Sequence, residues 1–550
     1  MKIEKSNILY VSLIIIIWLC AYIFFQVAFE QKLGWDEINY MSQARGIAQD
    51  FDFSARSYTI IGLLKYGYPT NLINYPIYPL FLAIFFKVFG VSMYVAYFSN
   101  WLCALGVCIL TYFIFLTLSD NSHKLAFAVS MFYLFAPGIL KNCDSGMMEQ
   151  CGCFLLCLFL LLILKDYKRS IFNVWTLVKI TISLLILFLY KSLYIGYFFG
   201  IFVLIFLTYK TNIISKVINT KIPFFVSFIS SFGSFVIFTY VLSKWIFLPV
   251  APMMNFSPEQ DLTQEYADFL GGYFNNFSVN LTKNLIYFLK NIIAPYFIYP
   301  TSYIPYTGEI LQTTSWFVFL GIYFIVFLLI LLLTFSGWKN MTPVQRLFVC
   351  FSITTIISFN LIFDVLFRSY HTNILRYNSY YLPIYFCLVA IVLKANLEYV
   401  KSFVTGYPLL TKLIGFIFIL FIYMPMSLSA LVQYLYNEDY YHVPARERAE
   451  FIEKVIGNTK PKFIYFNDGT HTAYVTYPVV QIFKDATNEQ LIQANKVLPE
   501  PIEYLFLRPS DWLVRNNKDL ILKGEPIVNG MYKLLGYNEK EHIVVYKLNK

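Results

Sequence analysis

Long apolar runs separated by short polar segments fill most of this chain. About eleven of these runs approach the roughly 20 residues that a helix needs to cross a bilayer. They lie near residues 8–29, 93–118, 124–141, 149–165, 174–190, 192–209, 222–248, 314–335, 347–366, 379–397 and 412–432. The pattern predicts a polytopic α-helical membrane protein, and the composition agrees, with 58% hydrophobic and only 13% charged residues and a mean hydropathy of +0.60.

Lys191 interrupts the apolar stretch 174–209, which could form one tilted helix or two helices joined by a tight turn. The charges of the other loops decide between them. With two helices, the cytoplasmic loops and helix ends hold fourteen Lys and Arg residues against four acidic residues. The acidic residues are Glu4, Asp120, Asp166 and Glu398. This excess obeys the positive-inside rule, so we expect two helices with Lys191 at the outer surface.

This topology divides the chain into a transmembrane domain, 1–432, and an extracytoplasmic domain, 433–550. Two large outer loops, 30–92 and 249–313, belong to the first domain. The second domain alternates a helix-like segment with strand-like segments, which predicts a small α/β domain. Its expected helix is 445–456, and its expected strands are 462–466, 502–507 and 542–548.

Carboxylates gather at the predicted outer ends of helices. Asp36 and Glu37 follow the first apolar run, and Asp144 follows the third. An unpaired carboxylate beside a bilayer is costly, which makes these residues functional candidates. A structural alternative stays open, because Asp36 could cap an amphipathic interfacial helix over 38–49, and Asp144 could be an ordinary loop residue. Glu149 and Glu309 read as ordinary helix-boundary residues.

Aromatic and basic residues occupy the same predicted level. Tyr75 and Tyr78, each followed by proline, precede an apolar helix, and Lys191, Arg368, His371 and Arg376 lie in outer segments. Each has a plain structural alternative. Lysine can extend along apolar surface to the interface, a lone histidine can be satisfied there, and aromatic residues line both interfaces of a membrane.

The order of these features resembles the GT-C glycosyltransferases. That membrane-embedded group includes protein O-mannosyltransferases and the aminoarabinose transferases that modify lipid A. The similar segments are GWDEINYMSQARGIAQD with Asp36, NYPIYPLFLAIFFKVFG, LFAPGILKNCDSGMMEQ with Asp144, LFLYKSLYIGYFFG with Lys191, and HTNILRYNSYYLPIYF with Arg376, Tyr377, Leu382 and Pro383. Ser192 departs from the pattern, because the family usually has glycine soon after that lysine.

The resemblance implies transfer of a sugar from a polyprenyl phosphate to an acceptor at the outer face, with inversion at the anomeric carbon. Asp36 would be the general base, with Asp144 and Glu37 as further catalytic carboxylates. The donor phosphate would meet Lys191, Arg376, Arg368 and His371, and Tyr75, Tyr78 and Tyr377 would line the substrate site. The two aspartates would then meet beside the lipid-borne phosphate.

Several identities stay open at this level. A divalent cation, Mg²⁺ or Mn²⁺, could bind the acidic residues through oxygen ligands, but the sequence shows no metal-ligand spacing. The acceptor could be lipid A, a cell-wall glycan or a protein. The composition, rich in Phe, Tyr, Ile and Asn, favours a bacterial chain, and the topology then predicts the inner membrane with a periplasmic site. The net charge of +10 is scattered over helix ends, which argues against nucleic-acid binding.

Two other functions compete with glycosyl transfer. A transporter or flippase of a lipid-linked glycan would also have many helices, but transporters tend to place charges near the bilayer midplane and to show paired repeats. A surface-polysaccharide polymerase or ligase would use a similar donor, but we would expect outer-loop arginines without an early Asp-Glu pair. Replacement of Asp36 by asparagine separates these functions.

Overall fold

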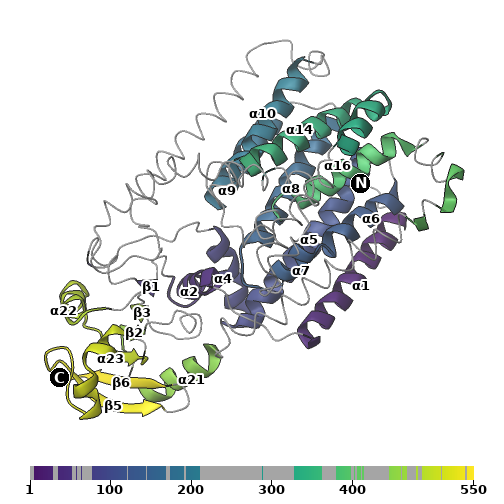
Figure 1. Ribbon diagram of the computed structural model, residues 1–550. Helices are drawn as coiled ribbons and strands as arrows, with labels where there is room; N and C mark the ends of the chain where they lie inside the picture. The colour runs from purple at the N-terminus through teal and green to yellow at the C-terminus, as the bar shows by residue number, and fades with distance from the viewer. Residues whose placement is uncertain are drawn as a thin grey trace, which may run out of the picture. The chain divides into compact units, whose positions relative to one another are not determined.

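The computed structural model forms two compact units (Figure 1). The first comprises Met1–Gln31, Asn100–Phe238 and Gly272–Asp439, and the second comprises Lys32–Ser99, Thr239–Gly271 and Tyr440–Lys550. The structure describes residues 5–28, 35–51, 57–58, 64, 77–119, 122–143, 145–168, 174–190, 194–210, 288, 328–361, 379–397, 402, 405–409, 412–413, 445–459, 461–466, 479–480, 486–509, 511–538 and 542–549.

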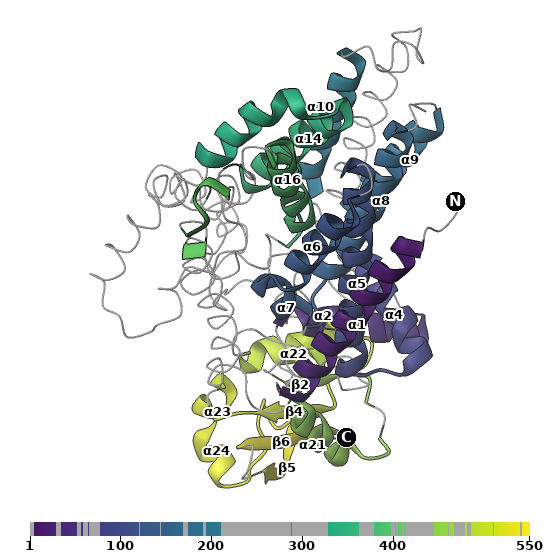
Figure 2. The same cartoon turned by 90° about the vertical axis from the view of Figure 1, so that its right-hand side faces the viewer.

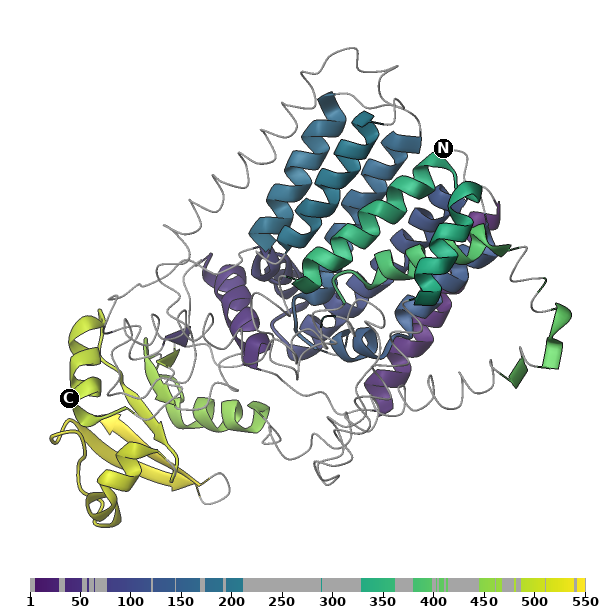
Figure 3. The same ribbon diagram turned by 45° about the horizontal axis from the view of Figure 1, so that its top comes forward.

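The first unit is a bundle of apolar helices (Figures 1 and 3). Its helices are α1 (Lys5–Ala28), the greater part of α5 (Met93–Ser119), α6 (His123–Leu134), α7 (Pro137–Cys143), α8 (Glu149–Lys168), α9 (Val174–Tyr190), α10 (Ile195–Lys210), α14 (Pro343–Asn360) and α16 (Leu382–Ala395). α6 packs against α1 and α16, α14 packs against α10 and α16, and α8 packs against α9. Segments far apart in the sequence therefore share one core.

The two helices expected on either side of Lys191 are confirmed. α9 ends at Tyr190 and α10 begins at Ile195. The single span expected over 124–141 is wrong, because α6 ends at Leu134 and a separate helix, α7, begins at Pro137. Proline lacks the N–H that would continue a helix, but it suits the first helical position. The predicted span 222–248, and most of 314–335 and 412–432, lie outside the described residues.

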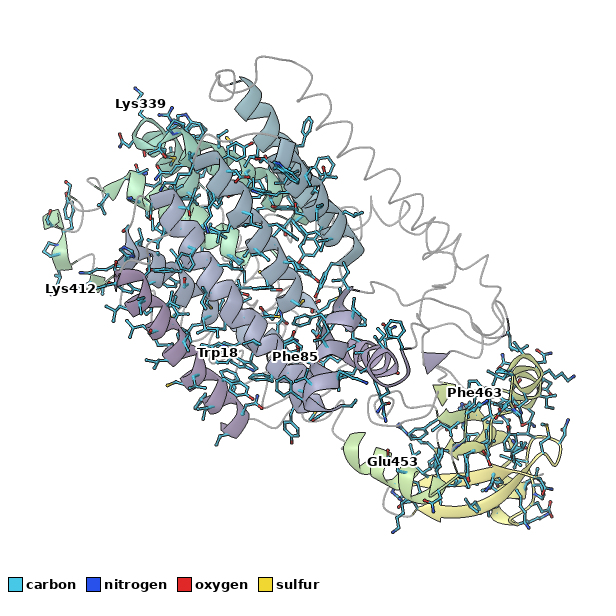
Figure 4. All side chains as sticks on the ribbon, turned by 180° about the vertical axis from the view of Figure 1, so that it is seen from behind. Trp18, Phe85, Lys339, Lys412, Glu453 and Phe463 are labelled. Carbon is cyan, nitrogen blue, oxygen red and sulfur yellow. The ribbon has the colours of Figure 1, made fainter. Side chains whose placement is uncertain are left out.

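The described helices have the surface of a membrane protein. Three of them are long and apolar enough to cross a bilayer, namely Lys5–Val27, Met93–Ser119 and Glu149–Lys168. Shorter apolar helices are Ile77–Phe89, Val178–Leu187, Leu328–Asn340 and Leu382–Ala395. α1 exposes Leu9, Ile16 and Phe24 by more than half, whereas Trp18 (Figure 4) is buried and donates its indole N–H to the Trp101 carbonyl at 2.8 Å. The apolar outer face suits lipid contact, as the sequence pattern predicted.

Hydrogen bonds fix the start of α14, which follows the short 3₁₀ helix η3 (Trp338–Asn340). The Thr342 hydroxyl accepts from the Gln345 N–H, and the Gln345 side-chain carbonyl accepts from the Thr342 N–H, so the two residues form a capping box. The Gln345 amide also donates to the Leu118 carbonyl at 2.7 Å. This contact ties α14 to the end of α5.

The second unit contains helices α2 (Trp35–Asp50) and α4 (Ile77–Phe89), which pack against each other. The helix expected over 38–49 is confirmed, with Met41 and Ala44 fully buried and Gln49 exposed, but Ser42 and Arg45 are buried too, so the expected separation into an apolar and a polar face is only partial. α2 begins at Trp35, which places Asp36 in its first turn instead of at the N-cap. α4 ends at Phe89, and the next residue, Gly90, has a φ of 88°, a conformation that glycine adopts without strain.

A six-stranded sheet fills the C-terminal part of the second unit (Figure 2). The strands are β1 (Ser57–Tyr58), β2 (Ile464–Phe466), β3 (Val479–Val480), β4 (Tyr504–Leu507), β5 (Tyr532–Asn538) and β6 (Ile543–Leu548). Their order is β1-β3-β2-β4-β6-β5. The first four strands in this order are parallel to one another, β6 is antiparallel to β4, and β5 is antiparallel to β6. The accompanying helices are α21 (Ala445–Ile456), α22 (Asn488–Val497), α23 (Trp512–Asn516) and α24 (Lys518–Leu522).

Side chains alternate between two cores along the sheet, as the period of a strand requires. Tyr465 and Leu505 pack in the core that includes Leu491 of α22. Ile464 and Phe506 pack in the other core, with Ile452 of α21. Phe463 and Glu453, labelled in Figure 4, lie in this part of the chain. The predicted helix and the three predicted strands are confirmed, and the small sheet fits the expected α/β domain.

Strand β1 comes from the first large loop, far from the rest of the sheet in sequence. Ser57 pairs with Val479 and Tyr58 with Val480, in parallel register. Leu64, a few residues further on, packs against the core that contains Leu491. Strands of two residues carry too little periodicity to be recognised in a sequence. The sheet therefore includes a piece of the loop that also holds Asp36 and Glu37.

Candidate functional site

In the second unit, the predicted acidic pair lies in the first turn of α2. Glu37 is only 3% exposed, and its Oε2 accepts a hydrogen bond from the Tyr97 hydroxyl of α5 at 3.3 Å. A buried carboxyl group is costly unless it is hydrogen-bonded. The Tyr97 bond offsets that cost and fixes Glu37, so the backbone that carries Asp36 is anchored. The Asp36 side chain itself lies outside the described residues.

The predicted Tyr-Pro segment leads into α4 and holds α2 in place. Tyr78 has no exposed surface, and its ring lies edge-on to Tyr40 with centroids 5.4 Å apart. The Lys87 ammonium donates to the Ala48 carbonyl at 3.2 Å, near the end of α2. In this structure Tyr78 is a packing residue between the two helices. Its expected contact with substrate stays a prediction.

In the first unit, the residues that follow Asp144 form a tightly held turn, Ser145–Met148, before α8. The Asn100 amide of α5 donates to the Ser145 carbonyl and, at 2.7 Å, to the Met147 carbonyl. The Ser145 hydroxyl donates to the Asn142 carbonyl at 2.7 Å. These side chains satisfy backbone groups that the turn would otherwise leave unpaired. Cys143 and Ser145, the two neighbours of Asp144 in the chain, are both buried.

Two tyrosines from distant elements reach this turn and the first residue of α8. The Tyr190 hydroxyl, at the end of α9, donates to the Met148 carbonyl. The Tyr380 hydroxyl, just before α16, donates to Glu149 Oε1 at 3.3 Å. All three side chains, Tyr190, Tyr380 and Glu149, have no exposed surface. The described neighbours of Asp144, Lys191 and Arg376 are thus brought together at one turn.

Gly152 allows these tyrosines to approach α8. A Cβ at this position would lie 2.6 Å from Tyr190 Cε1 and would overlap the Tyr194 hydroxyl. The side-chain carbonyl of Gln150, the residue after Glu149 in α8, accepts from the Tyr133 hydroxyl at 2.7 Å. Gln150 and Tyr133 are also fully buried. We call Tyr133, Glu149, Gln150, Tyr190, Tyr194 and Tyr380 the buried polar cluster.

Most residues that the sequence nominated lie outside the described residues. These are Tyr75, Asp144, Lys191, Arg368, His371, Arg376 and Tyr377. Their roles stay predictions, although the neighbours of Asp144, Lys191 and Arg376 converge. Among the described residues there is no group of three or more His, Cys, Asp or Glu side chains that could hold a metal. Whether Mg²⁺ or Mn²⁺ binds stays open, because the side chains of Asp36 and Asp144 lie outside that set.

Sequence reasoning missed the buried polar cluster. Glu149 is a helix-boundary residue, as expected, because α8 begins there. It is not an ordinary one, since it is fully buried and hydrogen-bonded to a residue 231 positions away. The only available signal was proximity along the chain. Glu149 follows Asp144 within five positions, Tyr190 precedes Lys191, and Tyr380 follows Arg376 within four.

Comparison with known proteins supports the fold. No protein-family model matches the sequence, and no curated protein matches it. The structure is similar to that of ArnT from Cupriavidus metallidurans bound to undecaprenyl phosphate, with a TM-score of 0.50 and 12% identity. The apo state of the same protein matches with a TM-score of 0.51 and 11% identity. Each comparison covers 98% of this chain and 97% of ArnT.

The fold is therefore of the GT-C type, as the order of the sequence motifs indicated. The likeness includes both the helical bundle and the C-terminal sheet, because it covers nearly the whole of both chains. At 12% identity it defines the fold and not the chemistry.

Proposed function

We propose that this protein is an integral membrane glycosyltransferase that takes a sugar from a polyprenyl-phosphate donor. The full-length likeness to ArnT, a protein solved with undecaprenyl phosphate bound, carries the proposal. The order of the acidic, Tyr-Pro, lysine and Arg-Tyr motifs supports it from the sequence. The acceptor is a lipid, a glycan or a protein at the extracytoplasmic face, and the protein resides in the inner membrane.

In the proposed reaction, Asp36 removes the proton from the acceptor hydroxyl while the hydroxyl oxygen attacks the anomeric carbon. The bond between that carbon and the phosphate oxygen breaks on the opposite side, so the configuration inverts. The electron pair leaves with the polyprenyl phosphate. Lys191 and Arg376, with Arg368 and His371 nearby in sequence, stabilise the charge that develops on the phosphate. Arginine suits this role because its guanidinium can donate two hydrogen bonds to one phosphate.

The convergence at Ser145–Glu149 supports these assignments. Glycosyl transfer from an amphiphilic donor needs a carboxylate and cations at one level, beside the phosphate. The described neighbours of one predicted carboxylate, Asp144, and of two predicted cations, Lys191 and Arg376, meet at this turn. Asp144 then supports the acceptor or a cation, and Glu37 supports Asp36. Tyr75, Tyr78 and Tyr377 line the substrate site in this proposal.

The test compares wild-type protein with Asp36→Asn in a deletion strain. Envelope glycolipids, glycans and glycoproteins are profiled by mass spectrometry, and membrane insertion is checked by immunoblotting of membrane fractions. We expect one sugar modification to disappear on deletion, to return with wild-type protein and to stay absent with Asp36→Asn. Asp519→Asn, at an exposed residue of α24, is the matched control and should restore the modification.

Two results would contradict the proposal. An unchanged modification in the Asp36→Asn strain would favour a transporter or flippase, which needs no general base. Loss of a whole polymer, with the donor-linked repeat unit accumulating, would favour a polymerase or ligase. The anomeric configuration of the product, read by NMR, tests inversion separately.

A further inference from the structure

We infer that Glu149 is a positioning residue for the lipid-phosphate site, acting through Tyr380 on the segment that carries Arg376. This inference rests on the proposed function. It assigns a role to a fully buried carboxyl group that the proposed reaction does not use. The link is the hydrogen bond from the Tyr380 hydroxyl to Glu149 Oε1, 3.3 Å long.

The first step concerns the cost of burying Glu149. It has no exposed surface, and a buried carboxyl group destabilises a fold unless hydrogen bonds compensate. Its place at the first residue of α8 is favourable for an acidic side chain, because the helix N-terminus carries partial positive charge. An exposed acidic residue would provide the same benefit to the helix at lower cost. The buried contact with Tyr380 is the feature that a simple helix start does not require.

The second step concerns how Tyr380 is held. Its ring lies edge-on to Tyr194 with centroids 5.1 Å apart and is stacked near Phe359 of α14 at 6.5 Å. The next residue, Tyr381, donates its hydroxyl to Asn360 Oδ1 at 3.1 Å. The segment that begins four residues after Arg376 is therefore fixed to α8 by one tyrosine and to the end of α14 by the other.

The third step concerns Lys191, the other predicted phosphate ligand. Tyr190, directly before it, donates its hydroxyl to the Met148 carbonyl, the residue adjacent to Glu149. One short stretch, Met148–Glu149, thus anchors the ends of both segments that carry the predicted phosphate cations. Small displacements of a binding group weaken a charged contact strongly. Loosening this anchor should reduce affinity for the lipid phosphate without removing any group that touches it.

The test measures binding of undecaprenyl phosphate to the full chain in lipid nanodiscs by native mass spectrometry. The variants are Tyr380→Phe, Glu149→Leu, the double variant and Glu149→Gln. Gln retains a carbonyl that can accept from Tyr380, so we expect its Kd within about threefold of wild type. We expect Tyr380→Phe and Glu149→Leu each to raise the Kd about tenfold, as for a lost hydrogen bond to a carboxylate. The double variant Tyr380→Phe/Glu149→Leu should have a Kd for undecaprenyl phosphate no higher than that of either single variant, because both substitutions remove the same hydrogen bond.

Tyr112→Phe is the matched control. Tyr112 is also fully buried, and its hydroxyl bonds His123 Nδ1 at 2.8 Å, roughly 18 Å along α5 from Asn100 at 1.5 Å per residue. It should leave the Kd within twofold of wild type. Melting temperatures of all variants are recorded, because a merely structural role would lower them without a selective change in lipid affinity.

Each outcome separates the inference from the proposed function. Wild-type protein that fails to bind undecaprenyl phosphate would overturn both. Wild-type binding with an unchanged Kd in Tyr380→Phe would overturn only the positioning role. Equal loss in Glu149→Gln and Glu149→Leu would overturn it too, since the negative charge, and not the hydrogen bond, would then be required.

Discussion

Two buried glutamates, Glu37 and Glu149, are similar in setting but differ in what holds them. Each lies in the first turn of a helix, follows a predicted catalytic aspartate, and accepts a tyrosine hydroxyl at 3.3 Å. The Tyr97 partner of Glu37 is 60 residues away, whereas the Tyr380 partner of Glu149 is 231 residues away. Each contact lies within one unit, and the first closes a loop about one quarter as long as the second.

The difference has a thermodynamic side. The entropy lost on closing a loop grows with its length, though slowly. Closing the Glu149 contact therefore costs more entropy than closing the Glu37 contact, and the turn before α8 depends on helices from both halves of the chain. We expect a substitution at Glu37 to perturb only the α2 region. We expect a substitution at Glu149 to perturb the segments of Lys191 and Arg376 as well.

The largest expected effect on sugar transfer comes from substituting Asp36 and Asp144, the aspartates that precede the two glutamates in the chain. Asp36→Asn should lower the rate of sugar transfer by about 100-fold or more, because general-base assistance contributes about 10²–10⁴-fold. Asp144→Asn, which removes the carboxylate proposed to support the acceptor or a cation, should lower that rate by about tenfold, as for a lost charged hydrogen bond. Transfer is measured with membranes and a radiolabelled polyprenyl-phosphate sugar. Asp519→Asn serves as the exposed control. A loss confined to Asp36→Asn would show that only the α2 region carries the reaction.

A substitution at Gly152 tests the close packing around the long-range contact of Glu149. Gly152→Ala should destabilise the bundle by about 2 kcal/mol, because the added methyl group overlaps Tyr194 and Tyr190. The melting temperature of detergent-solubilised protein should fall by several degrees. Gly536→Ala is the control, since nothing lies within 4 Å of a Cβ there. Equal melting temperatures for the two variants would contradict the close approach at α8.

Removing the Tyr97 and Tyr380 hydroxyls one at a time tests whether the contacts of the two glutamates are independent. Tyr97→Phe and Tyr380→Phe each delete a donor to a buried carboxyl group, which should cost about 1–3 kcal/mol. Hydrogen exchange read by mass spectrometry should increase in α2 for Tyr97→Phe. For Tyr380→Phe it should increase around Ser145–Glu149 and in the segment before α16. Identical exchange patterns would show that the two contacts are not independent.

Tyr532 offers a reference in which the acceptor is neutral. Its hydroxyl donates to the Ile502 carbonyl at 2.8 Å and accepts from the Asn495 amide at 2.8 Å. Tyr532→Phe should cost about 1 kcal/mol at pH 7, the smallest of these effects. The expected loss is measured by thermal unfolding of the full chain.

The pH dependence of that loss has a defined sign. Burial raises the pKa of Tyr532 above its ordinary value near 10. A raised folded-state pKa means that the stabilisation is complete below about pH 10 and is lost as pH rises further. The difference between wild type and Tyr532→Phe should therefore shrink above pH 10. A constant difference up to pH 11 would contradict the burial argument.

Much of the fold follows from the sequence because hydrophobic length and loop charge are strong signals. Lys191 was placed between two helices by the positive-inside rule, and α9 and α10 confirm it. Apolar length alone predicts one helix over 124–141, but a separate helix begins at Pro137. β1 could not be foreseen, because its two residues pair with a strand more than 400 positions away. That separation leaves no local pattern to read.

The candidate site was less predictable for a physical reason. Motifs identify side chains whose chemistry is unusual beside a membrane, such as Asp36 and Asp144. The groups that hold such side chains are ordinary tyrosines, a glycine and a glutamate. Their importance arises from burial and long-range contact, as for Glu149 and Tyr380, which only the folded chain shows.

The central claim is that the predicted carboxylates and cations surround one lipid phosphate. The most direct measurement is an electron cryo-microscopy structure of the full chain with undecaprenyl phosphate in a nanodisc. The account predicts the phosphate beside Lys191 and Arg376, next to the Ser145–Glu149 turn, with Asp36 and Asp144 facing it. A phosphate bound elsewhere, or aspartates that open to opposite faces of the protein, would contradict the account.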